Sequence, residues 1–202
     1  NIENPTGYDI AGNKSTLIVK NCKFISKKTT LNHDGKLFIN GKSELEATEN
    51  YSSAVSTSST TKMYLLGGTL KAYNALSSGE GNIYLLGGKL ISTNGCIVRA
   101  RIYGANSARI YFGDTELEAT NGLKKWIELR GGYTALHFMK KGEMVEYSMD
   151  GETHSYTVSK NFDQNIFLYN NNGDTEFTFA DGSQLDKTIK EDQELLYHLG
   201  TY

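Results

Sequence analysis

The chain has 202 residues, which is enough for one well-buried domain or for one domain with a smaller appendage. Its 21 basic and 23 acidic residues nearly cancel, so the overall charge does not favour nucleic acid as a partner, and no apolar run approaches the roughly 20 residues that a membrane-spanning helix needs. Twenty-one glycines beside a single proline, with short apolar runs between Gly, Ser and Asn, predict an all-β fold.

Six similar units follow one another between residues 17 and 138. They read LIVKNCKFIS from Leu17, LFINGKSELEAT from Leu37, MYLLGGTLKA from Met63, IYLLGGKLIS from Ile83, IYFGDTELEAT from Ile110 and IELRGGYTALHF from Ile127. A repeat with a period of about 20 to 50 residues indicates a solenoid, in which each unit packs on the next.

Each unit is predicted to form two short strands joined by a bend. The first strand places pairs such as Leu65 and Leu85 on an inward face, because side chains alternate along a strand. The bends are expected at Asn21, Gly41, Gly67, Gly87 and Gly131, and one residue early at Gly113-Asp114, since Gly and Asn adopt a positive φ at low cost. Units stacked about 4.8 Å apart would bury a continuous core. A flat antiparallel sandwich is the alternative.

The Asn21 bend, the glycine column and a further strand in CIVRARIYG (96–104) resemble the right-handed parallel β-helix family. That family includes pectate-lyase-like enzymes, phage tailspikes and bacterial surface adhesins. The resemblance covers about residues 8 to 138. It implies that residues 1–138 form a single-stranded, right-handed parallel β-helix of about six rungs.

Residues 139–202 do not continue the repeat. We expect them to form a cap or an oligomerisation element, and the assembly expected in the second case is a homotrimer. Asp150-Gly151 lies between two alternating runs (143–158) and predicts a β-hairpin. A second hairpin is expected over 165–181, turning at Asn171-Asn172-Gly173. A short amphipathic helix is expected in the final stretch, with Ser183 as its N-cap.

Outward positions of the first strand form a mostly aromatic column, which runs Ile18, Phe38, Tyr64, Tyr84, Tyr111 and Glu128. Sugar rings stack on aromatic faces, so Phe38, Tyr64, Tyr84 and Tyr111 are candidate ligand-binding residues for an extended glycan. The same column could instead form a contact between solenoids in a trimer, lie beneath the C-terminal segment, or stack in solvent.

A basic group is the second candidate site. Arg99 and Arg101 lie on the outward face of one strand, with Lys124 and Lys125 expected on the next turn, and together they would suit an acidic glycan. In the lyase branch of the resembling family, an Arg or Lys on this face removes a proton while bound calcium neutralises a uronate. Here the acidic residues Asp9, Asp34 and Asp114 are isolated in sequence.

Other reactive residues carry weaker signals. Glu44 with Glu46, and Glu116 with Glu118, are carboxylate pairs that either act as acid and base, bind a cation, or form an ordinary solvated strand face. The four histidines lack metal-ligand spacing, and Cys22 and Cys96 are expected to be buried thiols. No catalytic residue is assigned, and a metal site is left open.

From these features we expect a non-enzymatic carbohydrate-recognition or attachment module of a phage tail or bacterial surface protein. It would act outside the cell, at a cell surface or on a virion, without a cofactor. A polysaccharide lyase or glycoside hydrolase on the same scaffold, with calcium in the lyase case, is the first alternative. A purely structural trimeric spike segment is the second.

Overall fold

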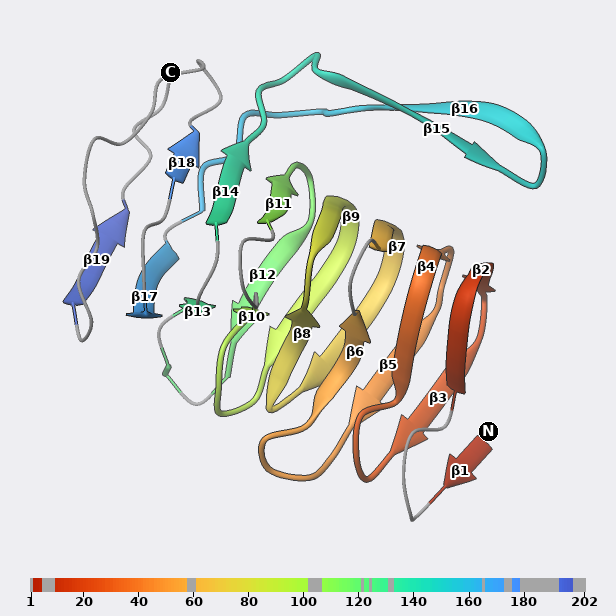
Figure 1. Cartoon of the computed structure of the whole chain (residues 1–202), viewed down its shortest axis with the longest axis horizontal. Helices are drawn as coiled ribbons and strands as arrows, with labels where there is room; N and C mark the ends of the chain where they lie inside the picture. Colours follow the sequence, from red (N-terminus) through yellow and green to blue (C-terminus); the bar gives the residue numbers. More distant parts are fainter. Residues whose placement is uncertain are drawn as a thin grey trace.

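The structure is a computed structural model, and it describes residues 2–4, 10–57, 61–101, 107–120, 122–123, 125–130, 133–164, 166–172, 176–178 and 193–197. These residues form a parallel β-solenoid, so the predicted all-β fold is confirmed and the antiparallel sandwich is wrong. Figure 1 shows the strands stacked side by side, with β1 (Ile2–Asn4) and β19 (Gln193–Tyr197) at opposite ends of the stack.

The strands stack on three faces. The first face contains the C-terminal parts of β2 (Ile10–Lys20) and β4 (Leu31–Asn40), the first halves of β7 (Thr61–Ala72) and β9 (Gly81–Ser92), β11 (Ser107–Phe112), β14 (Tyr133–Phe138) and β18 (Glu176–Thr178). The second contains β1, β3 (Lys23–Ser26), β5 (Glu44–Ala47), the second halves of β7 and β9, and β12 (Glu116–Ala119). The third contains the N-terminal parts of β2 and β4, β6 (Ser53–Thr57), β8 (Asn74–Ser78), β10 (Val98–Arg101), β13 (Trp126–Arg130) and β17 (Ile166–Asn172).

The solenoid has about four turns, fewer than the six rungs that the repeat predicts. Turns that carry a strand on every face include β4–β5–β6, β7–β8, β9–β10 and β11–β12–β13. The sixth unit of the repeat is not a turn of its own. Ile127 stacks on Val98 of the third face, and it is Leu136 of β14 that stacks on Ile110.

The inward faces form one continuous hydrophobic core, as the alternation predicts. Leu37, Met63, Ile83 and Ile110 are in register on successive turns, and each is at most 1% exposed. Leu65 and Leu85 belong to the same core. Because every inward position packs on its counterpart above and below, each turn depends on its neighbours for burial.

The bends between the first and second faces are only partly where the sequence predicts them. Asn21 and Gly41 have positive φ (56° and 65°), as expected. The units MYLLGGTLKA (63–72) and IYLLGGKLIS (83–92) are nearly identical and are called the twin phrases. In them the residues with positive φ are Gly68 (87°) and Gly88 (74°), one position after the predicted Gly67 and Gly87. Gly113 is not among the glycines with positive φ, and Gly131 lies outside the described residues.

The first predicted hairpin is confirmed. β15 (Met144–Met149) and β16 (Glu152–Thr157) pair in antiparallel register, and Asp150 and Gly151 both have positive φ (58° and 81°). This combination of two positive-φ residues matches the twist of a two-residue hairpin turn. In Figure 1 the hairpin extends as a long arm along one side of the strand stack.

The second hairpin and the helix are wrong. β17 pairs in parallel with β13, and β18 pairs in parallel with β14, so parallel stacking continues past residue 138. Residues 193–197 of the expected helix are strand β19, which pairs antiparallel with β17; Ser183 lies outside the described residues. β19 thereby occupies an edge of the solenoid that another chain could otherwise extend. The division into domains at residue 138 stays a prediction.

Candidate ligand-binding site

The aromatic column forms a ladder of stacked rings on the first face. Ring centroids are 4.9 Å apart between Phe38 and Tyr64, 4.8 Å between Tyr64 and Tyr84, and 4.5 Å between Tyr84 and Tyr111, with interplanar angles of 8° or less. His137 continues the ladder at 5.4 Å from Tyr111. It takes the place predicted for Glu128, because β14 rather than β13 stacks on β11.

The hairpin covers this ladder. Val145, Tyr147, Met149 and Tyr156 of the hairpin belong to the same hydrophobic cluster as the ladder rings. Tyr147 lies 5.8 Å from Phe38 and 5.4 Å from Tyr64, measured between ring centroids. Phe38 is fully buried and Tyr64 is 6% exposed, so these rings form a second small core in the structure. Their predicted ligand-binding role stays a prediction that would require the hairpin to move.

The hairpin is fixed at its base by polar contacts with the solenoid. The Tyr156 hydroxyl donates to Asp114 Oδ2 at 3.0 Å, and the Ser159 amide donates to the same oxygen at 2.8 Å. Burial raises the pKa of Tyr156, and its hydrogen bond to Asp114 raises it further. Burial also raises the pKa of Tyr84 to about 12, with smaller contributions from Tyr111 and Tyr64. Tyr84 is therefore neutral at physiological pH.

A cavity of about 370 Å³ opens on the third face, away from the hairpin. It lies where the loops from the second face enter β8, β10 and β13, and its lining residues are Tyr73, Asn94, Gly95, Cys96, Arg99, Leu123, Trp126 and Glu128. The volume is within the range of about 300 to 1,000 Å³ that is typical of small-molecule sites. Most of the lining is aromatic or apolar, with a few polar groups among it.

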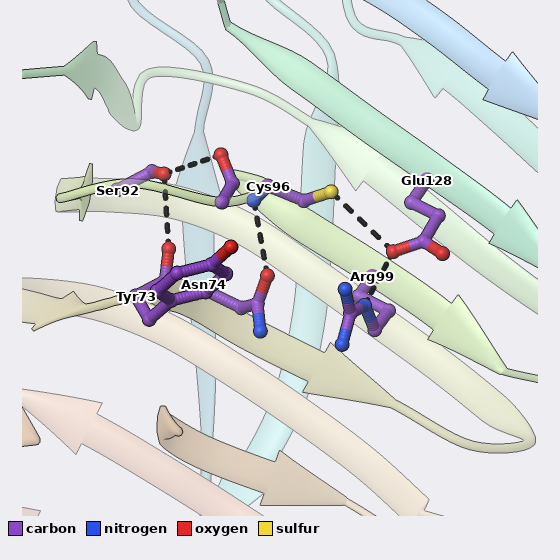
Figure 2. Close-up of polar contacts among 7 residues, drawn as sticks. Tyr73, Asn74, Ser92, Cys96, Arg99 and Glu128 are labelled. Atoms are coloured by element: carbon purple, nitrogen blue, oxygen red, sulfur yellow. Dashed lines mark hydrogen bonds and ion pairs between the residues drawn. The ribbon is translucent and has the colours of Figure 1, made fainter. Parts of the chain in front are cut away.

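The polar centre of the cavity is a pair of opposite charges on adjacent strands. Arg99 of β10 is opposite Glu128 of β13, and Arg99 Nε donates to Glu128 Oε2. The Arg99 side chain is 14% exposed and that of Glu128 is 4% exposed. The Cys96 thiol lies 3.5 Å from the same carboxylate oxygen, to which it donates (Figure 2).

The loop before β10 is held in place by hydrogen bonds to the preceding turn (Figure 2). The Cys96 amide donates to the buried Asn74 Oδ1 at 3.0 Å, and the Ser92 hydroxyl lies 3.1 Å from the Tyr73 carbonyl oxygen and 2.6 Å from that of Gly95. A Cβ on Gly95 would come within 2.5 Å of the Tyr73 ring, so this position needs glycine. The fold thus brings Tyr73 and Cys96 together in the lining of the cavity.

The environment keeps the Cys96 thiol protonated. Burial raises its pKa to about 12, and the nearby Glu128 carboxylate raises it as well. A thiolate is the nucleophilic and metal-binding form of cysteine, so Cys96 is suited to hydrogen bonding and packing rather than to attack. Cys22 and Cys96 are both free, partly buried thiols.

The predicted basic group is only partly brought together. Arg99 lines the cavity, whereas Lys125 is described but is not part of the lining. Arg101 is in β10 opposite Arg130, with its side chain outside the described part of the structure. Lys124 lies outside the described residues altogether.

The acidic pairs that the sequence singled out are engaged in ion pairs along the second face. Glu44 contacts Lys23 at 2.5 Å, Glu46 contacts Lys71 at 2.8 Å, and Lys89 bridges Glu116 and Glu118. Within the residues that the structure describes, no group of three or more His, Cys, Asp or Glu residues is placed to hold a metal ion. The carboxylate pairs are therefore parts of a surface charge ladder.

The sequence reasoning missed most of the cavity, namely Tyr73, Asn94, Gly95, Cys96, Leu123, Trp126 and Glu128. A signal was present. The segments IVRAR (97–101) and WIELR (126–130) share their apolar alternation and both end in Arg, which would have aligned Arg99 with Glu128. Starting the last unit at Ile127 instead placed Glu128 on the wrong face.

Comparison with protein-family models, with curated proteins and with solved structures finds no match for this chain. Across the described part of the chain, no helix has the length and apolar character needed to cross a membrane.

Proposed function

We propose that the protein is a non-enzymatic carbohydrate-recognition module, with the third-face cavity as its binding site. The single observation that carries the proposal is the composition of this cavity. Trp126 and Tyr73 supply aromatic surface, and Arg99, Glu128 and Asn94 supply hydrogen-bonding groups, within one recess of about 370 Å³. Sugars present apolar ring faces and polar hydroxyl rims, so they need this mixture of partners.

The position of the site on a rigid stack supports recognition. Arg99 and Glu128 lie on paired strands whose inward neighbours, Val98 and Ile127, are fully buried. Side chains on such a scaffold lose little further freedom when a ligand binds, which reduces the entropic cost of association.

The chemistry of the lining favours binding over cleavage. Glycoside hydrolysis uses two carboxyl groups about 5 to 10 Å apart, and among the described residues of the lining Glu128 is the one carboxylate. Arg99, a member of the predicted basic group, is hydrogen-bonded to that carboxylate. The proposal needs no cofactor. We also propose that the chain is related to right-handed β-helix proteins. We propose that it acts outside the cell or on a virion.

The test is binding of the intact chain to a glycan array, followed by calorimetry with the saccharides that bind. Trp126→Ala should weaken binding by about ten- to a hundredfold, because one sugar-stacking face is lost, whereas Trp126→Phe retains a ring and should lose less. Asn94→Ala changes an exposed loop residue that lines the cavity, so it should weaken binding while leaving thermal stability unchanged.

Met144→Ala is the matched control, since Met144 is 60% exposed on the distant hairpin. Equal loss of binding in Met144→Ala and Trp126→Ala would place the site elsewhere. Cleavage of a bound glycan by the native chain would favour the enzyme alternative. A chain that binds no saccharide and sediments as a trimer would favour the structural role.

A further inference from the structure

We propose that the third-face cavity selects a neutral pyranose residue and discriminates against its uronate counterpart. The inference rests on the proposed function and specifies its ligand class. It differs from the acidic glycan that the basic residues of the sequence predict. Among the described members of that basic group, Arg99 lines the cavity, and its charge is paired with that of Glu128.

The charge balance of the lining is the first step. Among the described residues that line the cavity, the charged ones are Arg99 and Glu128, whose formal charges cancel. Their side chains are 14% and 4% exposed, so the pair is largely withdrawn from water. Arg99 is therefore not a free counter-charge that a ligand carboxylate could engage without displacing Glu128.

The cost of a charged ligand is the second step. A uronate carboxylate would have to leave water and approach a recess that already contains the Glu128 carboxylate. Burying a charge without a partner is costly, and a like charge in a site of low polarity adds repulsion. A hydroxymethyl group at the same ring position carries no such penalty and can both donate and accept hydrogen bonds.

The shape of the lining is the third step. Tyr73 and Trp126 contribute flat apolar surface, and Leu123 and the Cys96 thiol add further apolar surface. The protonated state of Cys96 keeps a second negative charge out of the recess. A cavity of about 370 Å³ suits a single residue or the end of a chain better than a long chain bound along its length.

The experiment compares matched ligands. Methyl glycosides of neutral hexoses and of the corresponding uronates differ only in the group at C6, and their binding to the full chain is measured by calorimetry at low and high salt. We expect the uronates to bind about tenfold more weakly than the hexoses, and hexose binding to be insensitive to salt.

A charge variant sharpens the test. Glu128→Gln keeps the side-chain shape but leaves the Arg99 charge uncompensated, so the preference should reverse towards the uronate. The double variant Arg99→Gln/Glu128→Gln is neutral again and should retain the hexose preference. Circular dichroism and thermal unfolding test whether each variant is folded. If Glu128→Gln does not fold, the comparison of hexose and uronate binding to the native chain decides the inference.

The outcomes separate the two proposals. A native chain that binds uronates as well as or better than hexoses overturns the neutral-ligand inference and leaves carbohydrate recognition in place. A native chain that binds neither class overturns the proposed function itself. Hexose preference in the native chain that Glu128→Gln does not alter overturns the role given to charge balance.

Discussion

Single residues matter most where the solenoid leaves no room for a side chain. Gly88 has φ of 74°, and a Cβ there would lie 2.4 Å from the Gly68 carbonyl oxygen on the neighbouring turn. Gly122 has a similar φ of 71°, but a Cβ there would meet nothing within 4 Å. The pair separates the cost of the backbone conformation from the cost of close stacking.

We therefore expect Gly122→Ala to lower the free energy of unfolding by about 1 to 2 kcal/mol, the cost of a left-handed alanine. Gly88→Ala should lower it by several kcal/mol more than the control, because the new methyl group collides with backbone that cannot move aside. Denaturant unfolding of both variants provides the comparison. Equal losses would show that adjacent turns do not approach so closely.

Inward leucines should be intolerant of charge. Leu85 is fully buried in the stack, so Leu85→Asp places a carboxylate without a partner in the core and should prevent cooperative folding. Asn82→Asp, at a partly exposed position of the same strand, is the matched control and should melt close to the native chain. Circular dichroism melting curves test both, and a native-like Leu85→Asp would contradict the inward assignment.

At the residue scale, the sequence predicts the periodic positions well. Alternation assigns Leu65 and Leu85 to the core because burial on one face of a strand is a local property. The bends in the twin phrases are displaced by one residue because two glycines stand side by side, and sequence alone does not show which one takes the positive φ. The Arg99 and Glu128 contact depends on which distant strands pair, and the repeat misassigned that register.

Among the elements, the hairpin has the most specific dependence on the rest of the fold. It is two-stranded, and a two-stranded hairpin is marginally stable in water by itself. Its inward side chains pack on the aromatic ladder, while Met144, Glu146 and Ser148 face outward and are exposed. The ladder gives the hairpin a surface on which to fold, and the hairpin in turn packs over the buried rings of Phe38 and Tyr64.

Partial burial of Tyr84 makes the free energy of unfolding depend on pH in the alkaline range. The pKa of Tyr84 is raised in the folded chain from 10.0 to about 12, so between those values the folded state binds more protons than the unfolded state. The contribution of Tyr84 to the free energy of unfolding is therefore fully present below about pH 10 and is lost as the pH rises towards 12. Chemical unfolding at a series of pH values tests this. Tyr84→Phe should flatten the decline, and an unchanged slope would contradict the assignment.

Removal of the hairpin should expose the ladder without unfolding the solenoid. The Gly142 amide donates to the Val158 carbonyl oxygen at 2.9 Å, so residues 143–157 can be deleted by joining the two flanking positions. Because adjacent exposed aromatic rings form an apolar patch, we expect the shortened chain to self-associate and to bind a hydrophobic dye. Sedimentation and dye fluorescence are the measurements.

Met144→Ser, on the outer side of the hairpin, is the control and should behave as the native chain does. A shortened chain that keeps its sedimentation behaviour and binds no dye would show that the ladder is covered by something other than the hairpin. The local turn signal of Asp150-Gly151 was sufficient to predict this element. The segment over 165–181 failed as a hairpin because β17 and β18 find partners in distant strands instead.

At the scale of the whole molecule, a repeat in the sequence becomes a stack in space. The fold class follows from the repeat alone, since its units cannot bury their apolar faces separately. The number of turns does not follow, because one apparent unit is divided between the third face at β13 and the first face at β14. The cavity was missed for the same reason, because its lining residues come from three different turns and the repeat as divided did not align them.

The twin phrases occupy adjacent turns, with Met63 on Ile83, Tyr64 on Tyr84 and Leu65 on Leu85. Because their inward residues match, either segment can pack against the turns that flank the other. Duplication or excision of one such segment in the gene would therefore add or remove a whole layer while the flanking layers still find matching neighbours. Each turn gained or lost would change the length of the solenoid by about 4.8 Å. Recombination could therefore vary this length without requiring a new core.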